Sequence, residues 1–291
     1  MIFGICSNIS RDTDYKIADL CADVILELGS QPVFENDLKE SSLIIEKEGV
    51  SFGSFENADV IISIGGDGTL LSVVSRYRDL NIPFIGINKG SIGFLTEIDV
   101  EDIRESIKLI IDGKYEILER LQLLCEVYDK DGNLKDGHIC LNDCVVTRGA
   151  KLNIVKMDLF IDGQYVEKFY GDGIIVSTPT GSTAYTLAAG GPILMPGMKN
   201  MIVTPLCPHT LQRSSYCISD KSVIEIKLGD FETAPIISPD GRSGVILEPF
   251  DTIKITGYES TIKTVMLGKS GFFETVRSKI TARGSFYEHK K

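Results

Sequence analysis

Apolar residues in the first third of the chain alternate between short continuous runs and stripes at helical spacing. Ile2–Cys6, Asp59–Ile64 and Pro83–Ile87 are short apolar runs, which predict buried strands. Apolar residues recur every three or four positions in Ile17–Leu28 and again in Val100–Asp112, which predicts two amphipathic helices. Strands that alternate with helices predict a parallel sheet with helices on its faces.

The residues at the ends of both stripes support the helix assignment. Ser10, Asp12 and Thr13 precede the first stripe, and their side chains can accept hydrogen bonds from the first N–H groups of a helix. Gly29 and Gly113 follow the two stripes, and glycine readily adopts the backbone conformation that ends a helix. We therefore expect both helices to stop at these glycines.

From about Leu121 the pattern changes to strands joined by tight turns. Asp131-Gly132 and Asp162-Gly163 are pairs that favour hairpin turns. The strand-like segments are Leu123–Tyr128, Ile139–Thr147, Ile154–Ile161, Val223–Leu228, Val245–Leu247, Thr252–Thr256 and Thr261–Leu267. The sequence therefore predicts an α/β N-terminal domain with a parallel sheet, followed by a mainly β, sandwich-like domain.

Composition and charge narrow the class of protein. Of the 291 residues, 43% are hydrophobic and 24% charged, as in soluble globular proteins, and no apolar stretch reaches the roughly 18 residues of a membrane span. The net charge of −11 disfavours broad contact with nucleic acid or an anionic membrane, so we expect neither as a partner. An anionic ligand would instead bind through helix N-termini and converging backbone N–H groups.

The N-terminus and the cysteines indicate a cytoplasmic protein. The residues MIFGICSNISRD contain neither the basic region nor the long apolar stretch of a secretion signal. The seven cysteines are scattered without a Cys-x-x-Cys pair, which favours free thiols over a disulfide framework or a zinc site. With only three histidines, the chain has few candidates for a histidine base or a histidine-rich metal site.

A glycine-rich loop containing a carboxylate follows the second predicted strand. Gly65-Gly66-Asp67-Gly68-Thr69 leads into a segment that can open a helix, and a strand, a glycine turn and a helix N-terminus together form a phosphate cradle. A carboxylate is repelled by phosphate, so Asp67 is interpreted as accepting a proton from a hydroxyl nucleophile or as holding a metal. The alternative is that Asp67 only caps the helix.

Three further segments have the composition of ligand-binding loops. Gly86–Thr96 combines glycines with one aromatic ring, Asn142-Asp143 places two adjacent polar residues in a predicted strand, and Gly171–Tyr185 combines glycines, small hydroxyl residues and a terminal tyrosine. Taken singly, each also fits an ordinary structural part: a core ring, a solvated strand face and a surface loop.

In this order the four segments resemble the NAD kinase family. The Gly-Gly-Asp-Gly-Thr loop resembles one shared with diacylglycerol and sphingosine kinases and with 6-phosphofructokinases, which all use ATP to phosphorylate a hydroxyl group. The other three segments resemble NAD kinases alone, so that the similarity spans roughly Val60 to Arg242. The resemblance implies an enzyme that transfers the γ-phosphoryl group of ATP to the adenosine-ribose 2′-hydroxyl of NAD, giving NADP, with a divalent metal such as Mg²⁺.

The same resemblance implies the residues of the site. Asp67 is the expected general base, and no protein side chain is assigned to the metal. Where the family usually has Asn-Glu, this chain has Asn142-Asp143, whose shorter carboxylate reaches less far. Lys89 is a further candidate for a phosphate contact. The residues expected to bind NAD or ATP are Gly66, Gly68, Thr69, Phe94, Asn142, Asp143, Arg148, Asp172, Thr180, Thr183, Ala184, Tyr185 and Asp240.

The resemblance also implies a domain organisation and an assembly. Residues 1–118 would form the α/β domain with the glycine loop, and residues 119–268 the β-rich NAD-binding domain. Residues 269–291, with a short helix over Phe272–Ile280, would return to the N-terminal domain. Members of the family commonly form dimers or tetramers, so we expect a homo-oligomer.

Competing interpretations come from the same loop. A lipid kinase would need a basic or apolar membrane-facing surface, which the charge of −11 opposes, and a 6-phosphofructokinase would need basic sugar-phosphate motifs that the sequence lacks. A non-catalytic NAD or NADP sensor gains nothing from Asp67 beside the glycines, and turnover distinguishes it from an enzyme. The sequence leaves open whether polyphosphate replaces ATP, whether NADH is accepted, and whether NADP(H) regulates the protein.

Overall fold

A computed structural model gives the fold of the chain in two compact units. It describes residues 1–40, 47–89, 93–149, 153–210, 213–242, 244–268 and 271–284. The first unit comprises Met1–Leu118 together with Ile262–Lys291, and the second comprises Glu119–Thr261.

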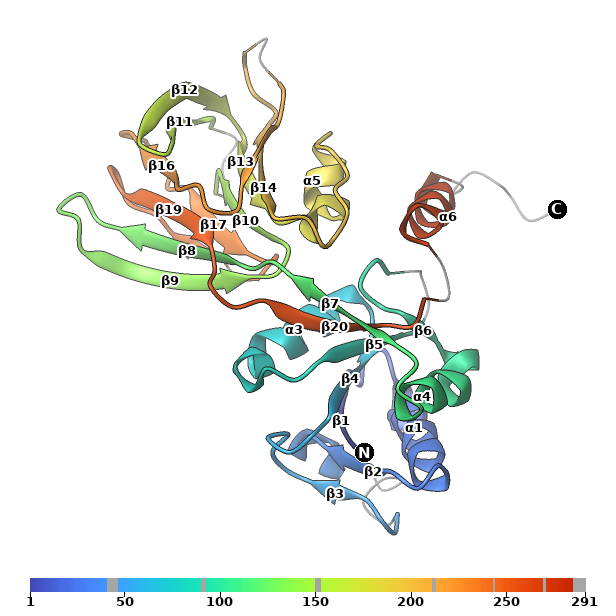
Figure 1. Ribbon diagram of the computed structural model, residues 1–291. Helices are drawn as coiled ribbons and strands as arrows, with labels where there is room; N and C mark the ends of the chain where they lie inside the picture. The colour runs from blue at the N-terminus through green and yellow to red at the C-terminus, as the bar shows by residue number, and fades with distance from the viewer. Residues whose placement is uncertain are drawn as a thin grey trace. The chain divides into compact units, whose positions relative to one another are not determined.

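The first unit is built on an eight-stranded sheet whose central strands are parallel (Figure 1). The strand order is β3-β2-β1-β4-β5-β20-β7, and β6 pairs with β5. Every residue of β4 and β5 is buried, as parallel strands covered on both faces require. The strands are β1 Ile2–Ser7, β2 Gln31–Phe34, β3 Ser51–Phe52, β4 Val60–Gly65, β5 Phe84–Asn88, β6 Ile98–Asp99, β7 Glu116–Arg120 and β20 Ile262–Met266.

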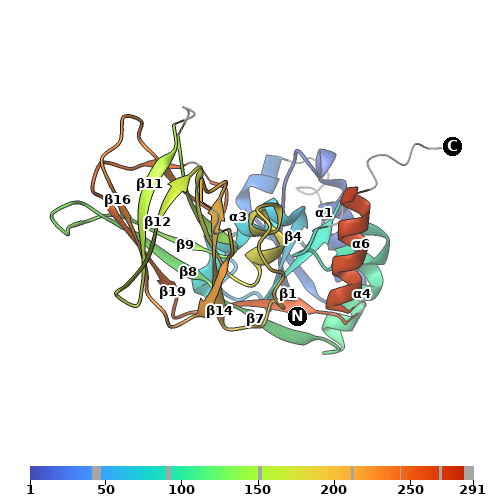
Figure 2. The same cartoon turned by 90° about the horizontal axis from the view of Figure 1, so that it is seen from above.

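Helices cover this sheet. Helices α1 and α4 lie side by side and share one apolar core with the strands (Figures 1 and 2). The helices are α1 Lys16–Glu27, α3 Asp67–Tyr77, α4 Ile103–Ile111 and α6 Phe272–Gly284, with 3₁₀ segments Thr13–Tyr15, Asn36–Glu40, Arg78–Leu80 and Val100–Asp102.

The strand order determines where this unit can bind a ligand. The chain moves from β1 outward to β2 on one side, and from β4 to β5 on the other. Right-handed crossovers therefore place α1 and α3 on opposite faces, and the connections diverge between β1 and β4. Ligands of open α/β sheets bind at the carboxyl ends of the strands at such a point. The glycine loop follows β4 at this position.

The predicted start and end of the first helix are confirmed. Of the three predicted capping residues, Asp12 accepts the hydrogen bonds, from the N–H groups of Ile17 at 2.8 Å and Ala18 at 3.0 Å. Gly29 and Gly113 end their helices with φ of 72° and 70°, in the region that favours glycine.

The second unit contains two six-stranded antiparallel sheets. Their strand orders are β15-β14-β13-β10-β17-β18 and β12-β11-β16-β19-β8-β9. One hydrophobic core draws residues from both sheets, as in a β-sandwich. The strands are β8 Leu123–Tyr128, β9 Leu134–Cys140, β10 Asp143–Thr147, β11 Val155–Ile161, β12 Gln164–Gly171, β13 Gly173–Ser177, β14 Asn200–Leu206, β15 Tyr216–Ser219, β16 Ile224–Leu228, β17 Ile236–Pro239, β18 Val245–Ile246 and β19 Thr252–Gly257, with a 3₁₀ segment Gly181–Thr183 and a short helix α5 Tyr185–Ala188.

Two predicted strands differ from the structure. The segment Ile139–Thr147 is not one strand, because the chain breaks between β9 and β10 at Leu141-Asn142. The segment Thr261–Leu267 does not extend the β-rich half, because β20 joins the first sheet parallel to β5. An alternating apolar pattern looks the same in either sheet, so only tertiary pairing selects the partner.

Candidate active site

The glycines that follow β4 leave space around the N-terminus of helix α3. Gly65 has φ of 152°, and a Cβ there would collide with the side chain of Thr69. Gly66 precedes α3 and Gly68 lies in its first turn, and a Cβ at either would meet no atom within 4 Å. Open space therefore adjoins the first turn of α3, where the helix dipole favours an anion.

The carboxylate of Asp67 binds a second segment of the chain. Its Oδ2 accepts a hydrogen bond from the N–H of Phe94 at 2.7 Å, and its Oδ1 accepts one from Leu95 at 3.0 Å. A Cβ at Gly93 would collide with Oδ1, so only glycine fits there. Asp67 therefore joins the loop after β4 to the segment after β5, rather than capping its own helix.

The loop after β1 also reaches the glycine loop. The amide of Asn8 donates from Nδ2 to Thr69 Oγ1 at 3.3 Å, and the backbone N–H of Asn8 donates to Ile64 O at 3.2 Å. Asn8 was not among the residues expected from the sequence. Its position directly after the first predicted strand was the signal, because the carboxyl ends of adjacent parallel strands meet.

The second unit contains a pocket of about 400 Å³ that gathers five of the expected ligand-binding residues. Arg148, Asp172, Thr180 and Thr183 do not belong to its lining. The lining residues are Asn142, Asp143, Val145, Thr147, Ala184, Tyr185, Ile236, Ser238, Asp240 and Gly241.

Asp240 holds the break between β9 and β10 in place. Its carboxylate accepts hydrogen bonds from three consecutive backbone N–H groups, those of Leu141 at 2.9 Å, Asn142 at 2.7 Å and Asp143 at 3.2 Å. The N–H of Asp240 in turn donates to Asp143 O at 2.8 Å, and Asp240 has φ of 48°. The turn at Asp240-Gly241 thus presents Asn142 and Asp143 to the pocket.

Two buried carboxylates give the pocket its electrostatic character. Burial raises the pKa of Asp143 to about 7, and the nearby carboxylate of Asp240 adds to this. Burial also raises the pKa of Asp240, although its three N–H donors and Arg242 act in the opposite direction. The pocket therefore carries a carboxyl group that titrates near neutral pH.

The amide of Asn142 has an unused acceptor. Asn142 is 9% exposed, and its Oδ1 has no hydrogen-bond partner among the residues that the structure describes. A buried carbonyl oxygen without a partner costs about 1–3 kcal/mol.

Hydrogen bonds of threonine hydroxyls hold the loop that follows β13 in place. Thr178 Oγ1 donates to Leu141 O at 2.6 Å and accepts from Gly181 N at 3.1 Å, and Thr183 Oγ1 donates to Thr180 O at 3.2 Å. The hydroxyls of Thr178 and Thr183 therefore hold the loop, while Ala184 and Tyr185 at its end line the pocket.

A buried arginine that was not expected from the sequence contacts this loop. Arg120 is 3% exposed, and its Nη1 donates to Thr180 Oγ1 at 3.3 Å. A single Arg outside every predicted strand and motif carried no signal in the sequence.

Two other expected residues pair with each other. Arg148 Nε lies 2.8 Å from Asp172 Oδ1, and the Arg148 N–H donates to Asp172 O at 2.9 Å. Lys89 is exposed after β5. Arg148 and Asp172 thus form an ion pair, and neither belongs to the pocket lining.

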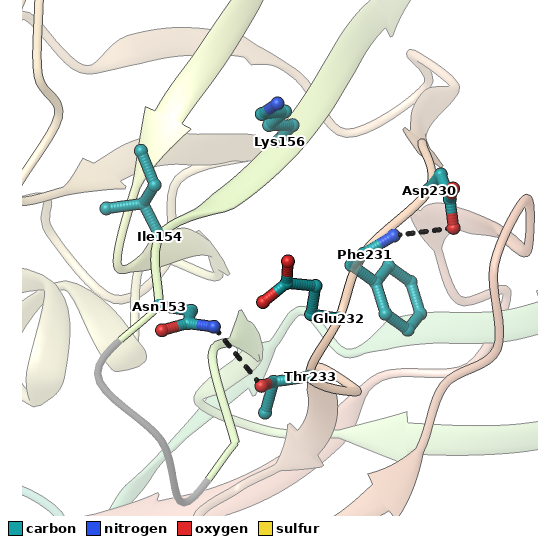
Figure 3. Close-up of a pocket in the computed structure, with 7 residues that line it drawn as sticks. All are labelled: Asn153, Ile154, Lys156, Asp230, Phe231, Glu232 and Thr233. Carbon is teal, nitrogen blue, oxygen red and sulfur yellow. Dashed lines mark hydrogen bonds between the residues drawn. The ribbon is translucent and has the colours of Figure 1, made fainter.

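A second hollow of about 300 Å³ lies elsewhere in the second unit (Figure 3). Its lining contains none of the expected site residues. Asn153 Nδ2 donates to Thr233 Oγ1 at 3.4 Å across it, and the Phe231 N–H donates to Asp230 Oδ1 at 2.9 Å. Its remaining lining residues are Ile154, Lys156 and Glu232.

In the part of the chain that the structure describes, no group of three or more His, Cys, Asp or Glu side chains is arranged to hold a metal ion. No helix found there is both long and apolar enough to cross a membrane.

Comparison with known proteins gives the same family over most of the chain. The ATP-NAD kinase N-terminal domain matches residues 3–115, and the ATP-NAD kinase C-terminal domain matches residues 141–267. The chain is 34% identical to the NAD kinase of Caldanaerobacter subterraneus subsp. tengcongensis over 281 residues, covering 96% of this chain and 99% of that protein. It is 36% identical to the NAD kinase of Desulforamulus reducens over 280 residues, covering 95% and 96%.

Solved structures have the same fold. The structure of yeast NADH kinase complexed with NADH matches with a TM-score of 0.83 and 25% identity, covering all of this chain and 89% of that one. The structure of an NAD kinase from Archaeoglobus fulgidus in complex with ATP matches with a TM-score of 0.74 and 24% identity, covering 97% and 99%. The two-unit architecture is therefore shared along the whole chain.

Proposed function

Since the chain belongs to the NAD kinase family, we propose that Asp67 is the general base of its reaction. The protein is a kinase that uses ATP to phosphorylate NAD. The observation that carries the assignment of the base is the location of its carboxylate: at the first residue of α3, beside glycines that leave open space for phosphate, and bonded to the segment after β5.

In this proposal Asp67 accepts the proton of the adenosine-ribose 2′-hydroxyl of NAD as that oxygen attacks the γ-phosphorus of ATP. Each carboxylate oxygen has two lone pairs, so the hydrogen bonds from Phe94 and Leu95 leave room for the hydroxyl. The same two bonds fix the direction of the carboxylate, and a fixed base contributes to rate because the reacting atoms need no further ordering.

Phosphate binding falls to the backbone of the glycine loop. Gly66, Gly68 and Thr69 surround the N-terminus of α3, whose dipole and backbone N–H groups would stabilise negative charge on the transferred group. Neither glycine has a neighbour within 4 Å of the Cβ position, so phosphate oxygens can approach the backbone closely.

We propose that the pocket of the second unit binds NAD. Its volume and its lining of both polar and apolar residues suit a nucleoside, and Tyr185, which is half-exposed, offers a flat surface. Thr180 and Thr183 would act by holding the loop. Arg148 and Asp172 would meet the ligand as an ion pair, in which Arg148 Nε contacts Asp172 Oδ1.

The donor set fits Mg²⁺ held mainly by ATP. Mg²⁺ retains waters and binds largely through substrate phosphates, so ATP would supply most of its ligands here. When bound, the ion neutralises charge on the phosphate oxygens. No described cluster competes for it.

The setting and assembly of the protein are also proposals. All seven cysteines are free, as in a reducing cytoplasm, where we propose that the enzyme works. We also propose that it is a homo-oligomer, a dimer or a tetramer, which light scattering after size-exclusion chromatography measures directly.

The direct test is turnover. Purified protein is incubated with NAD, ATP and Mg²⁺, and NADP is detected with an NADP-specific dehydrogenase. NADP formation supports the proposal. Binding of NAD without NADP formation, with ATP or with polyphosphate, would favour a sensor instead. Parallel reactions with NADH determine whether this chain also accepts the reduced dinucleotide found in complex with the yeast NADH kinase.

A further inference from the structure

Two basic side chains in the described part of the chain are buried: Arg120, which is 3% exposed, and Lys279, which is 6% exposed. Burying a cation costs free energy unless other groups compensate for the lost water. Both residues lie outside residues 3–115 and 141–267, the ranges matched by the two kinase domains. Lys279 belongs to α6, in the same unit as the glycine loop.

Lys279 lies against the segment that binds the proposed base. Its Nζ is 4.9 Å from the centre of the Phe94 ring, within the range of a cation–π interaction. The backbone N–H of the same Phe94 donates to Asp67 Oδ2 at 2.7 Å. One residue therefore contacts Lys279 through its ring and Asp67 through its backbone.

A second contact joins the same two parts of the chain. The N–H of Leu267, at the end of β20, donates to Glu97 Oε1 at 3.1 Å. Leu267 lies five residues before α6, and Glu97 lies three residues after Phe94. The C-terminal region thus contacts residues 93–97 twice, once at the Glu97 carboxylate and once at the Phe94 ring.

We propose that Lys279 is a positioning residue for phosphoryl transfer. Its ammonium holds the Phe94 ring, and the held segment keeps the N–H groups of Phe94 and Leu95 on the Asp67 carboxylate. Lys279 itself touches neither substrate in this proposal. The inference depends on the proposed role of Asp67 as base.

The expected fall in kcat follows from the strength of the cation–π interaction between Lys279 and Phe94. A cation–π contact removed from water is worth more than an exposed one, and losing it is expected to lower kcat about 5- to 30-fold. The KM values for NAD and ATP are expected to stay within about threefold, because the orientation of the base affects the transition state more than substrate binding.

The first comparison uses two variants and one control on the same helix. Lys279→Met keeps the length of the side chain and removes its charge, while Lys279→Arg keeps a cation that can stack on the ring. Arg277→Met removes a charge from an exposed position of α6 and should leave kcat unchanged. The expected pattern is a fall in kcat for Lys279→Met, recovery to within about threefold for Lys279→Arg, and no change for the control.

A double-mutant cycle tests whether the ring mediates the effect. In a Phe94→Leu background there is no ring for Lys279 to hold, so Lys279→Met should lower kcat by less than about twofold there. Equal falls in both backgrounds would overturn the proposal, as would a fall in kcat that Lys279→Arg does not restore.

Stability is measured alongside. If Lys279→Met does not fold, Phe94→Tyr and Phe94→Leu test the same contact with Lys279 retained: the proposal requires Tyr to preserve kcat and Leu to reduce it. Failure of the proposed function is separately visible, because the wild-type protein would then form no NADP. If Asp67→Asn retained turnover, the coupling between Lys279 and Phe94 could not act through the base, and the proposal would be wrong.

Discussion

The Asp67 carboxylate accepts a hydrogen bond from the backbone N–H of Phe94 at 2.7 Å, although 27 positions separate the two residues. This bond joins the carboxyl ends of β4 and β5, adjacent parallel strands of the first sheet. It places a carboxylate at a helix N-terminus with its orientation fixed from outside the helix. Substitutions of Asp67 and of Gly93 beside it have one set of expected outcomes. Substitutions of Asp240 and Asp143 in the second unit have another.

Asp67→Asn removes the proposed base while keeping the size of the side chain. Loss of a general base lowers kcat by about two to four orders of magnitude, and NAD should still bind, because the pocket of the second unit is unchanged. Turnover is measured by NADP formation and NAD affinity by calorimetry. The exposed Asp79→Asn is the matched control. Near-normal kcat in Asp67→Asn would reduce Asp67 to a structural residue.

Gly93→Ala should displace the Asp67 carboxylate, because the added Cβ would occupy the position of Oδ1. A misplacement of about 1 Å in a catalytic group can cost about 100-fold in rate, so kcat should fall strongly. Gly137→Ala is the control, since a Cβ at Gly137 meets no atom within 4 Å. Unchanged kcat in Gly93→Ala would show that the carboxylate does not need its present orientation.

Asp240→Ala should unfold more easily than the wild-type protein. It leaves the N–H groups of Leu141, Asn142 and Asp143 without their acceptor, and each unsatisfied buried group costs about 1–3 kcal/mol. We expect a loss of about 2–5 kcal/mol in the free energy of unfolding, measured with urea. Asp240→Asn keeps one acceptor oxygen and tolerates positive φ, so it should lose less. Equal losses would assign the effect to charge rather than to hydrogen bonding.

Asp143→Asn should change how stability depends on pH. The pKa of Asp143 rises from 3.8 to about 7 on folding, so the folded state favours the protonated form. The contribution of this group to stability is complete below pH 3.8 and is lost as the pH rises through 7. The variant, which cannot ionise, should gain stability relative to wild type as the pH rises from about 4 to about 8, by as much as about 4 kcal/mol.

Urea unfolding at a series of pH values gives this comparison. Asp131→Asn is the control, because it changes an exposed carboxylate and leaves an Asn-Gly pair, which suits the same hairpin turn. A parallel pH dependence of Asp143→Asn and wild type would mean that Asp143 stays ionised in the folded protein throughout this range.

Features that depend only on residues close together in the sequence could be predicted from the sequence. The helical stripe over Ile17–Leu28 needs only its own periodicity, and Gly29 ends it because glycine adopts positive φ at little cost. The hairpin turns at Asp131-Gly132 and Asp162-Gly163 are equally local. The strand, glycine turn and helix around Asp67 follow in the same way.

The sequence by itself therefore determined the local elements with a clear periodicity and the change from an α/β half to a mainly β half. The tertiary structure alone decided that β20 joins the first sheet, that Asp240 binds three N–H groups about a hundred positions away, and that Lys279 lies on Phe94. These contacts depend on strand pairing and on the paths of loops between distant segments. An alternating pattern or a single charged residue is compatible with several partners, and only packing in three dimensions selects one.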